Sequence, residues 1–150
     1  MILGVSLIIL RKDGKILIVQ ETEEKPWKKP GDFSIPMETK EENETYRETI
    51  NRAIEEEAKG VLEYEIERIN GKEDYNIMNL ALARCFIVKV IKHEKHISGN
   101  EVKNHKWLFP EEVLNLPLRI KAKEMIEDFI SNLKQTKEKK SPFFILKLSF

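Results

Sequence analysis

The sequence predicts an α+β fold of the α/β/α sandwich type, in which a mixed β-sheet lies between helices. Three observations lead to this prediction. Strand-like patterns precede and separate two segments whose apolar residues fall at helical spacing. One strand-like run is apolar almost throughout, as expected for a strand that is covered on both faces. At 150 residues the chain is long enough to bury a core and short enough to form one domain.

The first elements are a hairpin and a long loop. Residues 3–21 contain two apolar, β-rich runs around Asp13-Gly14, a dipeptide that is typical of tight hairpin turns. Residues 22–43 are rich in Pro, Gly and charge. A loop of this length inside a compact domain is usually functional or mobile.

The first helix is predicted by its start and by its apolar stripe. Thr45 and Glu48 fit a capping box, in which each side chain meets the backbone amide of the other residue. We therefore expect a helix from about Thr45 to Ala58, with one apolar stripe along its length.

The remaining strands and the second helix follow from their periodicity. Residues 60–71 alternate like a half-buried strand, and residues 79–91 form the nearly continuous apolar run. A loop in 99–113 leads into a short strand around Trp107 and then into a turn. Apolar residues at helical spacing predict an amphipathic helix over 119–133.

The end of the chain differs from the rest. We expect residues 1–134 to form the folded domain and residues 135–150 to form a charged linker with an apolar tail. The tail is either an added edge strand or an apolar patch that pairs with a second subunit. A homodimer through the tail is preferred, because nothing else in the sequence explains so much apolar surface after a solvated linker.

Composition and charge disfavour several classes of protein. Lys plus Arg and Asp plus Glu number 26 each, so zero net charge gives no field that attracts nucleic acid, and a general nucleic-acid binder is disfavoured. No stretch approaches the roughly 20 apolar residues that a membrane span needs. The single cysteine, Cys85, lies in an apolar run and is expected in the core of a protein from a reduced compartment. We expect a soluble cytoplasmic domain.

The first helix ends in three consecutive glutamates, which helical geometry separates. At about 100° per residue, Glu57 falls inside the apolar stripe, Glu56 at its border and Glu55 well away from it. Burying an unpaired carboxylate costs several kcal/mol, so Glu57 needs either a cation in an internal salt bridge or a place in a cleft. An i, i+4 ladder of Glu48, Arg52 and Glu56 is expected to orient Glu56.

The residues around this helix form an ordered pattern. Arg52 follows Glu44 by eight residues and precedes the paired acids Glu56 and Glu57. Further positions of the pattern are Pro36, Glu41 and Ile54. The pattern resembles the helix signature of the Nudix hydrolases, which contain MutT-like domains, and the resemblance covers roughly residues 3–134. It implies a Nudix fold with a mixed sheet between helices.

The signature is degenerate in its catalytic part. Ala53 stands where the family has the glutamate directly after the arginine. Position 53 and the glutamate one helical turn later would converge on one ion, so alanine removes one arm of the implied site. Met37 and Glu38 replace a pair of loop glycines, and Asn43 and Lys59 replace two more.

The resemblance implies a chemistry and a set of residues. The chemistry is Mg²⁺-dependent pyrophosphohydrolysis of a nucleoside diphosphate linked to another group, with Mn²⁺ as an alternative ion. Arg52, Glu56, Glu57 and Glu101 are the implied catalytic residues, with Glu56 and Glu57 binding metal and Arg52 orienting them. Glu38 and Glu101 are the candidates for the missing metal ligand. For each of these two the alternative is an ordinary loop carboxylate in solvent.

A second hypothesis stays open beside the hydrolase. The departures at position 53 and at the loop glycines favour a Nudix-fold module that binds a nucleotide or a protein with weak or no hydrolysis. Trp27, Phe33 and Trp107 are either packed or available to stack on a base. His105, next to the Trp strand, is a weak candidate for a place in the cleft. The implied partner of the first hypothesis is a small-molecule nucleotide, which the sequence does not name.

Overall fold

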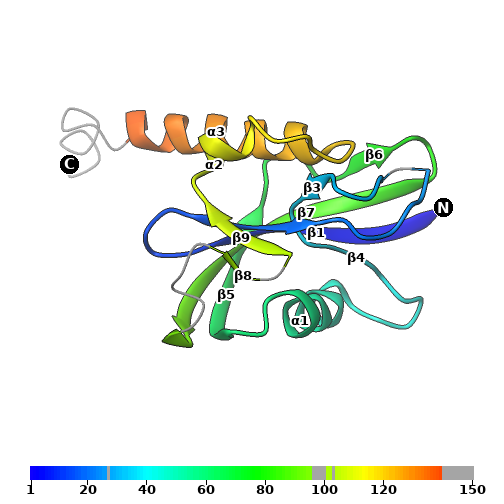
Figure 1. Cartoon of the computed structure of the whole chain (residues 1–150), viewed down its shortest axis with the longest axis horizontal. Helices are drawn as coiled ribbons and strands as arrows, with labels where there is room; N and C mark the ends of the chain where they lie inside the picture. The colour runs from blue at the N-terminus through cyan, green and yellow to red at the C-terminus, as the bar shows by residue number, and fades with distance from the viewer. Residues whose placement is uncertain (27, 96–100, 103, 140–150) are drawn as a thin grey trace.

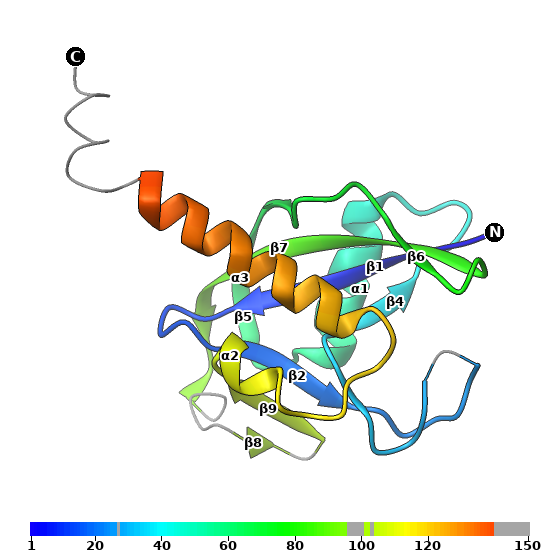
Figure 2. The same cartoon turned by 90° about the horizontal axis from the view of Figure 1, so that it is seen from above.

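A β-sheet between two helical layers forms the centre of the molecule (Figure 1). The computed structural model describes residues 1–26, 28–95, 101–102 and 104–139 of the chain. Helix α1 covers one face of the sheet, and α2 and α3 cover the other, where α3 lies across the strands (Figure 2). The α/β/α sandwich expected from the sequence is confirmed.

The sheet is mixed, as the order of strands shows. Its order is β5-β7-β1-β2-β9-β8, with β3 paired to β2, β4 to β1 and β6 to β7. Strands β1 and β7 run parallel, whereas the other neighbours are antiparallel. The strands are β1 (Ile2–Leu10), β2 (Ile16–Gln20), β3 (Phe33–Ser34), β4 (Met37–Thr39), β5 (Val61–Ile69), β6 (Tyr75–Ile77), β7 (Ala81–His93), β8 (Glu101–Val102) and β9 (His105–Leu108). The helices are α1 (Tyr46–Glu57), α2 (Pro110–Val113) and α3 (Ala122–Lys139).

Helix α1 starts and packs as its sequence predicts. Glu48 N–H donates to Thr45 Oγ1 at 3.1 Å, and Thr45 N–H donates to Glu48 Oε1 at 3.1 Å, so the capping box is present. Ile50, Ala53 and Ile54 are buried against the sheet. The position of this stripe around the helix axis determines how far each of the glutamates at 55–57 points away from the core.

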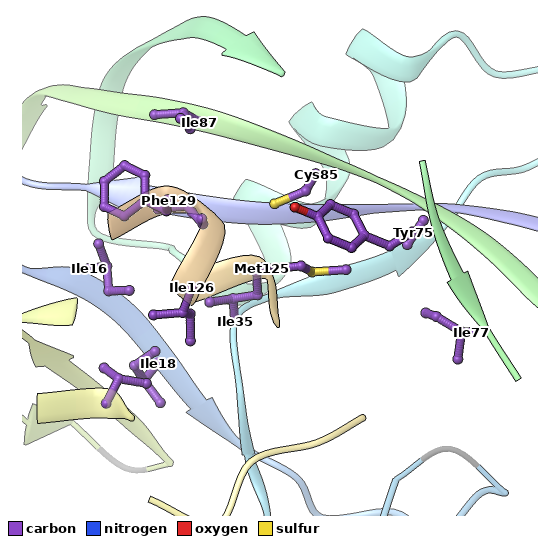
Figure 3. Packing of buried hydrophobic residues seen from close by; sticks show 13 residues of the cluster. Ile16, Ile18, Ile35, Tyr75, Ile77, Cys85, Ile87, Met125, Ile126 and Phe129 are labelled. Atoms are coloured by element: carbon purple, nitrogen blue, oxygen red, sulfur yellow. The ribbon is translucent and has the colours of Figure 1, made fainter. Parts of the chain in front are cut away.

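The second core lies between the sheet and α3 (Figure 3). Met125, Ile126 and Phe129 of α3 are fully buried over the strands. Cys85 of β7 is buried in the same core, as the sequence predicts, and this burial raises the pKa of its thiol. Strand β7 therefore contributes side chains to both cores, which explains its nearly continuous apolar sequence.

The end of the chain differs from its prediction. Helix α3 begins at Ala122 rather than at Arg119, because the Arg119 N–H donates to the Phe33 carbonyl at 2.9 Å. Lys121, with a left-handed φ of 72°, then separates that contact from the helix. The helix continues to Lys139, so the start of the expected linker is helical. The apolar tail and Trp27 lie outside the described residues, and the homodimer stays a prediction.

In the described part of the chain, no helix is long and apolar enough to cross a membrane.

Candidate functional site

Strand β4 carries Glu38 close to the start of β1. Strand β4 pairs antiparallel with β1, with Val5 opposite Glu38 and Gly4 opposite Thr39. A Cβ on Gly4 would lie 3.0 Å from the carbonyl oxygen of Glu38. Glycine at position 4 therefore permits the close approach that holds Glu38 in place.

Arg52 of α1 joins the helix to this loop. Its Nε and Nη2 donate to Glu44 at 3.1 and 2.8 Å, a bidentate pair, and Nη2 also donates to the Thr39 carbonyl at 2.7 Å. Its Nη1 lies 3.0 Å from Glu38 Oε1. The guanidinium thus fixes two carboxylates and one backbone carbonyl of the segment between β4 and α1.

Glu44 is the most strongly held of these acids. It also accepts hydrogen bonds from Glu41 N–H at 2.8 Å and from Thr49 Oγ1 at 3.1 Å. The hydrogen bonds from Arg52, followed by the one from Glu41, lower the pKa of Glu44 from 4.5 to about 2. Glu44 is therefore an ionised structural clamp at the start of α1, and its oxygens are already engaged.

The ladder expected along α1 is wrong. Glu48 caps the helix, and the ion-pair partners of Arg52 are Glu38 and Glu44 rather than Glu48 and Glu56. An exposed i, i+4 ion pair stabilises a helix by only about 0.2–0.5 kcal/mol. The bidentate, partly buried pair of Arg52 with Glu44 is stronger, so it forms in place of the pairs with Glu48 and Glu56. Arg52 consequently orients Glu38, and Glu56 is left without this cation.

The carboxyl groups of Glu38 and Glu56 face each other. Burial raises the pKa of Glu38, and the Glu56 carboxylate raises it further, both as a hydrogen-bond partner and as a like charge, while Arg52 opposes the shift. Two carboxylates held this close repel each other unless a proton or a cation lies between them. The structure therefore brings together two acids, from β4 and from α1, that the sequence separates by eighteen positions.

Glu57 has a different partner. Its Oε2 lies 3.5 Å from His105 Nε2, and its side chain is 36% exposed. Trp107 of β9 is buried in the core beneath α1, and side chains two apart in a strand share a face. His105 therefore points to α1, and the alternation of β9 was the signal that would have placed it there.

The other aromatic and acidic candidates do not all reach this site. Trp107 is 3% exposed and has the Arg11 guanidinium 4.9 Å from its ring centroid, so its faces are occupied. Phe33 packs against the second core, with Lys106 Nζ 5.1 Å from its ring. The backbone of Glu101 lies in β8, and its side chain is outside what the structure describes.

A cavity of about 240 Å³ lies next to the acids and shares Glu38 with them. Its apolar lining comes mainly from Ile2, Val5, Met37, Ile77, Ala81 and Leu82. Lys25, Lys28 and Arg119 also line it. No pattern in the sequence marks Arg119 as a site residue, because it precedes a helix and only the fold brings it to β3 and β4.

The acids fit a hard divalent cation only in part. The described residues contain no group of three or more His, Cys, Asp or Glu side chains arranged around one point. They do contain the Glu38 and Glu56 pair, with Glu57 next in the chain. Mg²⁺ keeps several waters and needs only one or two protein carboxylates, so this pair is a suitable donor set.

A mixed sheet between helices, with a carboxylate-bearing helix beside a short strand and a cavity, defines a domain of the Nudix class. The family model of the NUDIX domain matches residues 2–129, and the chain belongs to this family. Nudix proteins are in general hydrolases that use divalent metal ions. The comparison with curated proteins finds no match.

Solved structures with the same fold are distant in sequence. A mutT/nudix family protein from Listeria innocua is 18% identical, with a TM-score of 0.67 over 89% of this chain and 94% of that one. The Ap4A hydrolase of C. elegans is 15% identical, with a TM-score of 0.62 over 89% of this chain and 98% of that one. Shewanella oneidensis NrtR in complex with a 27mer DNA is 20% identical, with a TM-score of 0.61 over 89% of this chain and 62% of that one. These similarities show the fold.

Proposed function

We propose that this domain is a Mg²⁺-dependent pyrophosphohydrolase acting on a nucleoside diphosphate linked to another group, with Mn²⁺ able to replace Mg²⁺. The observation that supports it is the pair of facing carboxyl groups of Glu38 and Glu56 beside a cavity that Glu38 lines. A small-molecule nucleotide is the proposed partner, and the name of the C. elegans Ap4A hydrolase places a dinucleotide among the substrates worth testing.

The residues divide into ligands and positioning groups. Glu38, Glu56 and Glu57 would hold the ion, with Glu101 of β8 as a further ligand or base. The bound ion supplies charge neutralisation of the phosphates and a lower pKa for water. Arg52 fixes Glu38, so it acts on the site through another residue. In this proposal Glu38 takes the place of the carboxylate that Ala53 lacks.

A nucleotide- or protein-binding module without hydrolysis is the second candidate function. Ala53 favours it, since this side chain is fully buried in the core and α1 therefore offers no carboxylate at that position. Catalysis would then require Glu38 or Glu101 to replace the carboxylate that α1 lacks at position 53. Binding of a nucleotide without turnover distinguishes this candidate from the first.

The test is hydrolysis of nucleoside triphosphates, dinucleoside polyphosphates, nucleotide sugars and ADP-ribose, with Mg²⁺ and then with Mn²⁺. We expect turnover of at least one substrate, and a loss of at least about 100-fold in kcat for Glu56→Gln, as for removal of a metal ligand. Glu55→Gln, one residue away on the solvent side of α1, is the matched control and keeps full activity. Nucleotide binding without turnover under both ions would leave the second candidate function.

A further inference from the structure

Strand β5 presents a long unpaired edge at one end of the sheet. It spans nine residues and pairs only with β7 among the residues that the structure describes. The strand at the other end of the sheet, β8, has only two residues. A long unpaired edge offers a row of backbone N–H and C=O groups to a further strand, and proteins usually blunt or cover such an edge.

Apolar hollows flank this edge on both faces of the sheet. Leu62 is 50% exposed and, together with Tyr64, lines two hollows. Ile91 of β7 completes the first hollow, and it faces away from α1 because its neighbour Val90 is buried in the core beneath that helix. Ile54 of α1 lines the second hollow. A strand added to β5 would direct alternate side chains into both hollows.

The apolar tail, residues 143–150, has the sequence that such an edge requires. These residues lie outside the described part of the chain. Residues 143–146 are all apolar, a pattern that in a strand needs cover on both faces. The tail is also almost as long as β5. The two hollows at the edge therefore match the two apolar faces of its first half.

The charges of the edge select a basic segment over a second β5. Glu63 and Glu65 are exposed on β5, and Glu67 beside them pairs with Arg68 and Lys89. Two β5 strands paired edge to edge would bring like charges together, which is destabilising. Residues 134–147 contain five lysines and one glutamate, so the segment that leads into the tail has the opposite charge.

The path of α3 favours the tail of a second copy over the chain's own tail. Asn132 lies beside Gly71, just after β5, and from there α3 continues for seven residues, about 10 Å, until its end projects beyond the sheet (Figure 2). From Lys139 to Phe144 the chain spans at most roughly 18 Å. Leu62 lies seven residues before the end of β5, roughly 23 Å along the strand. The first phenylalanines of the chain's own tail therefore fall short of Leu62.

We propose that the tail of one chain adds as an edge strand to β5 of a second copy, with Phe143 and Phe144 in the two hollows, and that the second copy returns the contact. The three phenylalanines of a tail bury about 150–250 Å² each, so two reciprocal tails bury roughly 900–1,500 Å². A stable interface buries about 1,200–2,000 Å², which a reciprocal exchange reaches and a single tail does not. This inference does not depend on the proposed hydrolysis.

The first test is the oligomeric state of the full chain, measured by sedimentation equilibrium over a range of concentrations. The natural chain should form a dimer. Leu62→Arg and Phe144→Asp should each raise the dissociation constant of the dimer by at least about 30-fold, as for the loss of an interface hot spot. The matched control is Leu80→Arg, which replaces a leucine that is 43% exposed at the opposite end of β7 from Ile91, and it should leave the dimer unchanged.

The second test is disulfide cross-linking, which identifies the occupant of the edge. A Leu62→Cys chain is mixed with a Phe144→Cys chain and oxidised, and the linked peptides are read by mass spectrometry. The disulfide should join the two different chains, because Cys85 is buried and does not compete. Leu80→Cys mixed with Phe144→Cys should give no such link. A chain that carries both Leu62→Cys and Phe144→Cys should form its disulfides between chains.

Three results would overturn the inference. One is a monomer at every concentration. Another is a dimer that Leu62→Arg dissociates and Phe144→Asp does not, because β5 would then pair with a second β5. The third is a disulfide that forms only within one chain, which would mean that the tail covers its own edge. None of these results bears on hydrolysis, so the two proposals fail or stand separately.

Discussion

Restoring the family's glutamate at position 53 should harm this protein. Ala53 is fully buried in the core between α1 and the sheet, beside Ile50 and Ile54. The larger side chain of Ala53→Glu overpacks this core at a cost of about 1–3 kcal/mol. Burying an unpaired polar group there adds about 1–3 kcal/mol. The sum is about 2–6 kcal/mol, and for a chain of this length it lowers Tm by roughly 5–20 °C.

The cost of this substitution should also depend on pH. Burial raises the pKa of the introduced carboxyl group above its unfolded value of about 4.3. The unfolded chain then binds fewer protons than the folded chain between these two pKa values, so stability falls as pH rises above about 4.3. Ala53→Gln has nearly the same size and no titration, and it should show the overpacking cost without the added pH dependence.

The assay is thermal unfolding of the natural chain and both variants at pH 4.5 and 7.5, with hydrolysis measured at the higher pH. We expect Ala53→Glu to be less stable than Ala53→Gln at pH 7.5 and close to it at pH 4.5. An unchanged Tm together with a gain in hydrolysis would refute this reasoning. That outcome would mean that position 53 reaches the carboxylates instead of the core.

Three further predictions concern the acids. Arg52→Lys keeps the charge but loses the bidentate grip on Glu44 and the contact with Glu38, and it should lower Mg²⁺ affinity by about 10- to 100-fold in a metal titration. The pKa of Glu44 is lowered to about 2, so its ionised form stabilises the fold above about pH 4.5, and this stabilisation is lost as the pH falls towards 2. The urea midpoint of unfolding should therefore fall less between pH 5 and 2 in Glu44→Gln than in the natural chain. Mg²⁺ at about 100 times its Kd should stabilise the folded chain by about 2.7 kcal/mol. Glu38→Gln should remove most of this stabilisation. An equal stabilisation of the variant by Mg²⁺ would exclude Glu38 as a ligand.

The features that could be predicted from sequence are those that depend on local periodicity. The phase of α1 follows from its apolar residues, which placed Ala53 in the core and Glu56 at the border of the stripe. The Asp13-Gly14 turn and the Thr45 cap have short-range signals, and both are present in the structure. For these elements the local preference and the tertiary fold agree.

The features that could not be predicted depend on which distant segments meet. Arg52 had acidic neighbours on its own helix, yet its partners come from the β4 to α1 segment, because the pairing of β4 with β1 brings that segment to the guanidinium. Arg119 looked like the first residue of a helix, and its backbone bond to Phe33 is a long-range contact. No periodicity within either segment contains this information.

The position of Arg52 bears on whether the degenerate signature still works. A ladder to Glu56 would have satisfied that carboxylate within the helix and reduced its need for a cation. Instead Arg52 is committed to Glu44 and Glu38, and Glu38 has its pKa raised by burial and by the facing Glu56. The arginine therefore brings the loop acid to the helix acid and compensates their mutual repulsion only in part. A divalent cation relieves that repulsion, and a site built from one loop carboxylate and one helix carboxylate does not require a glutamate at position 53.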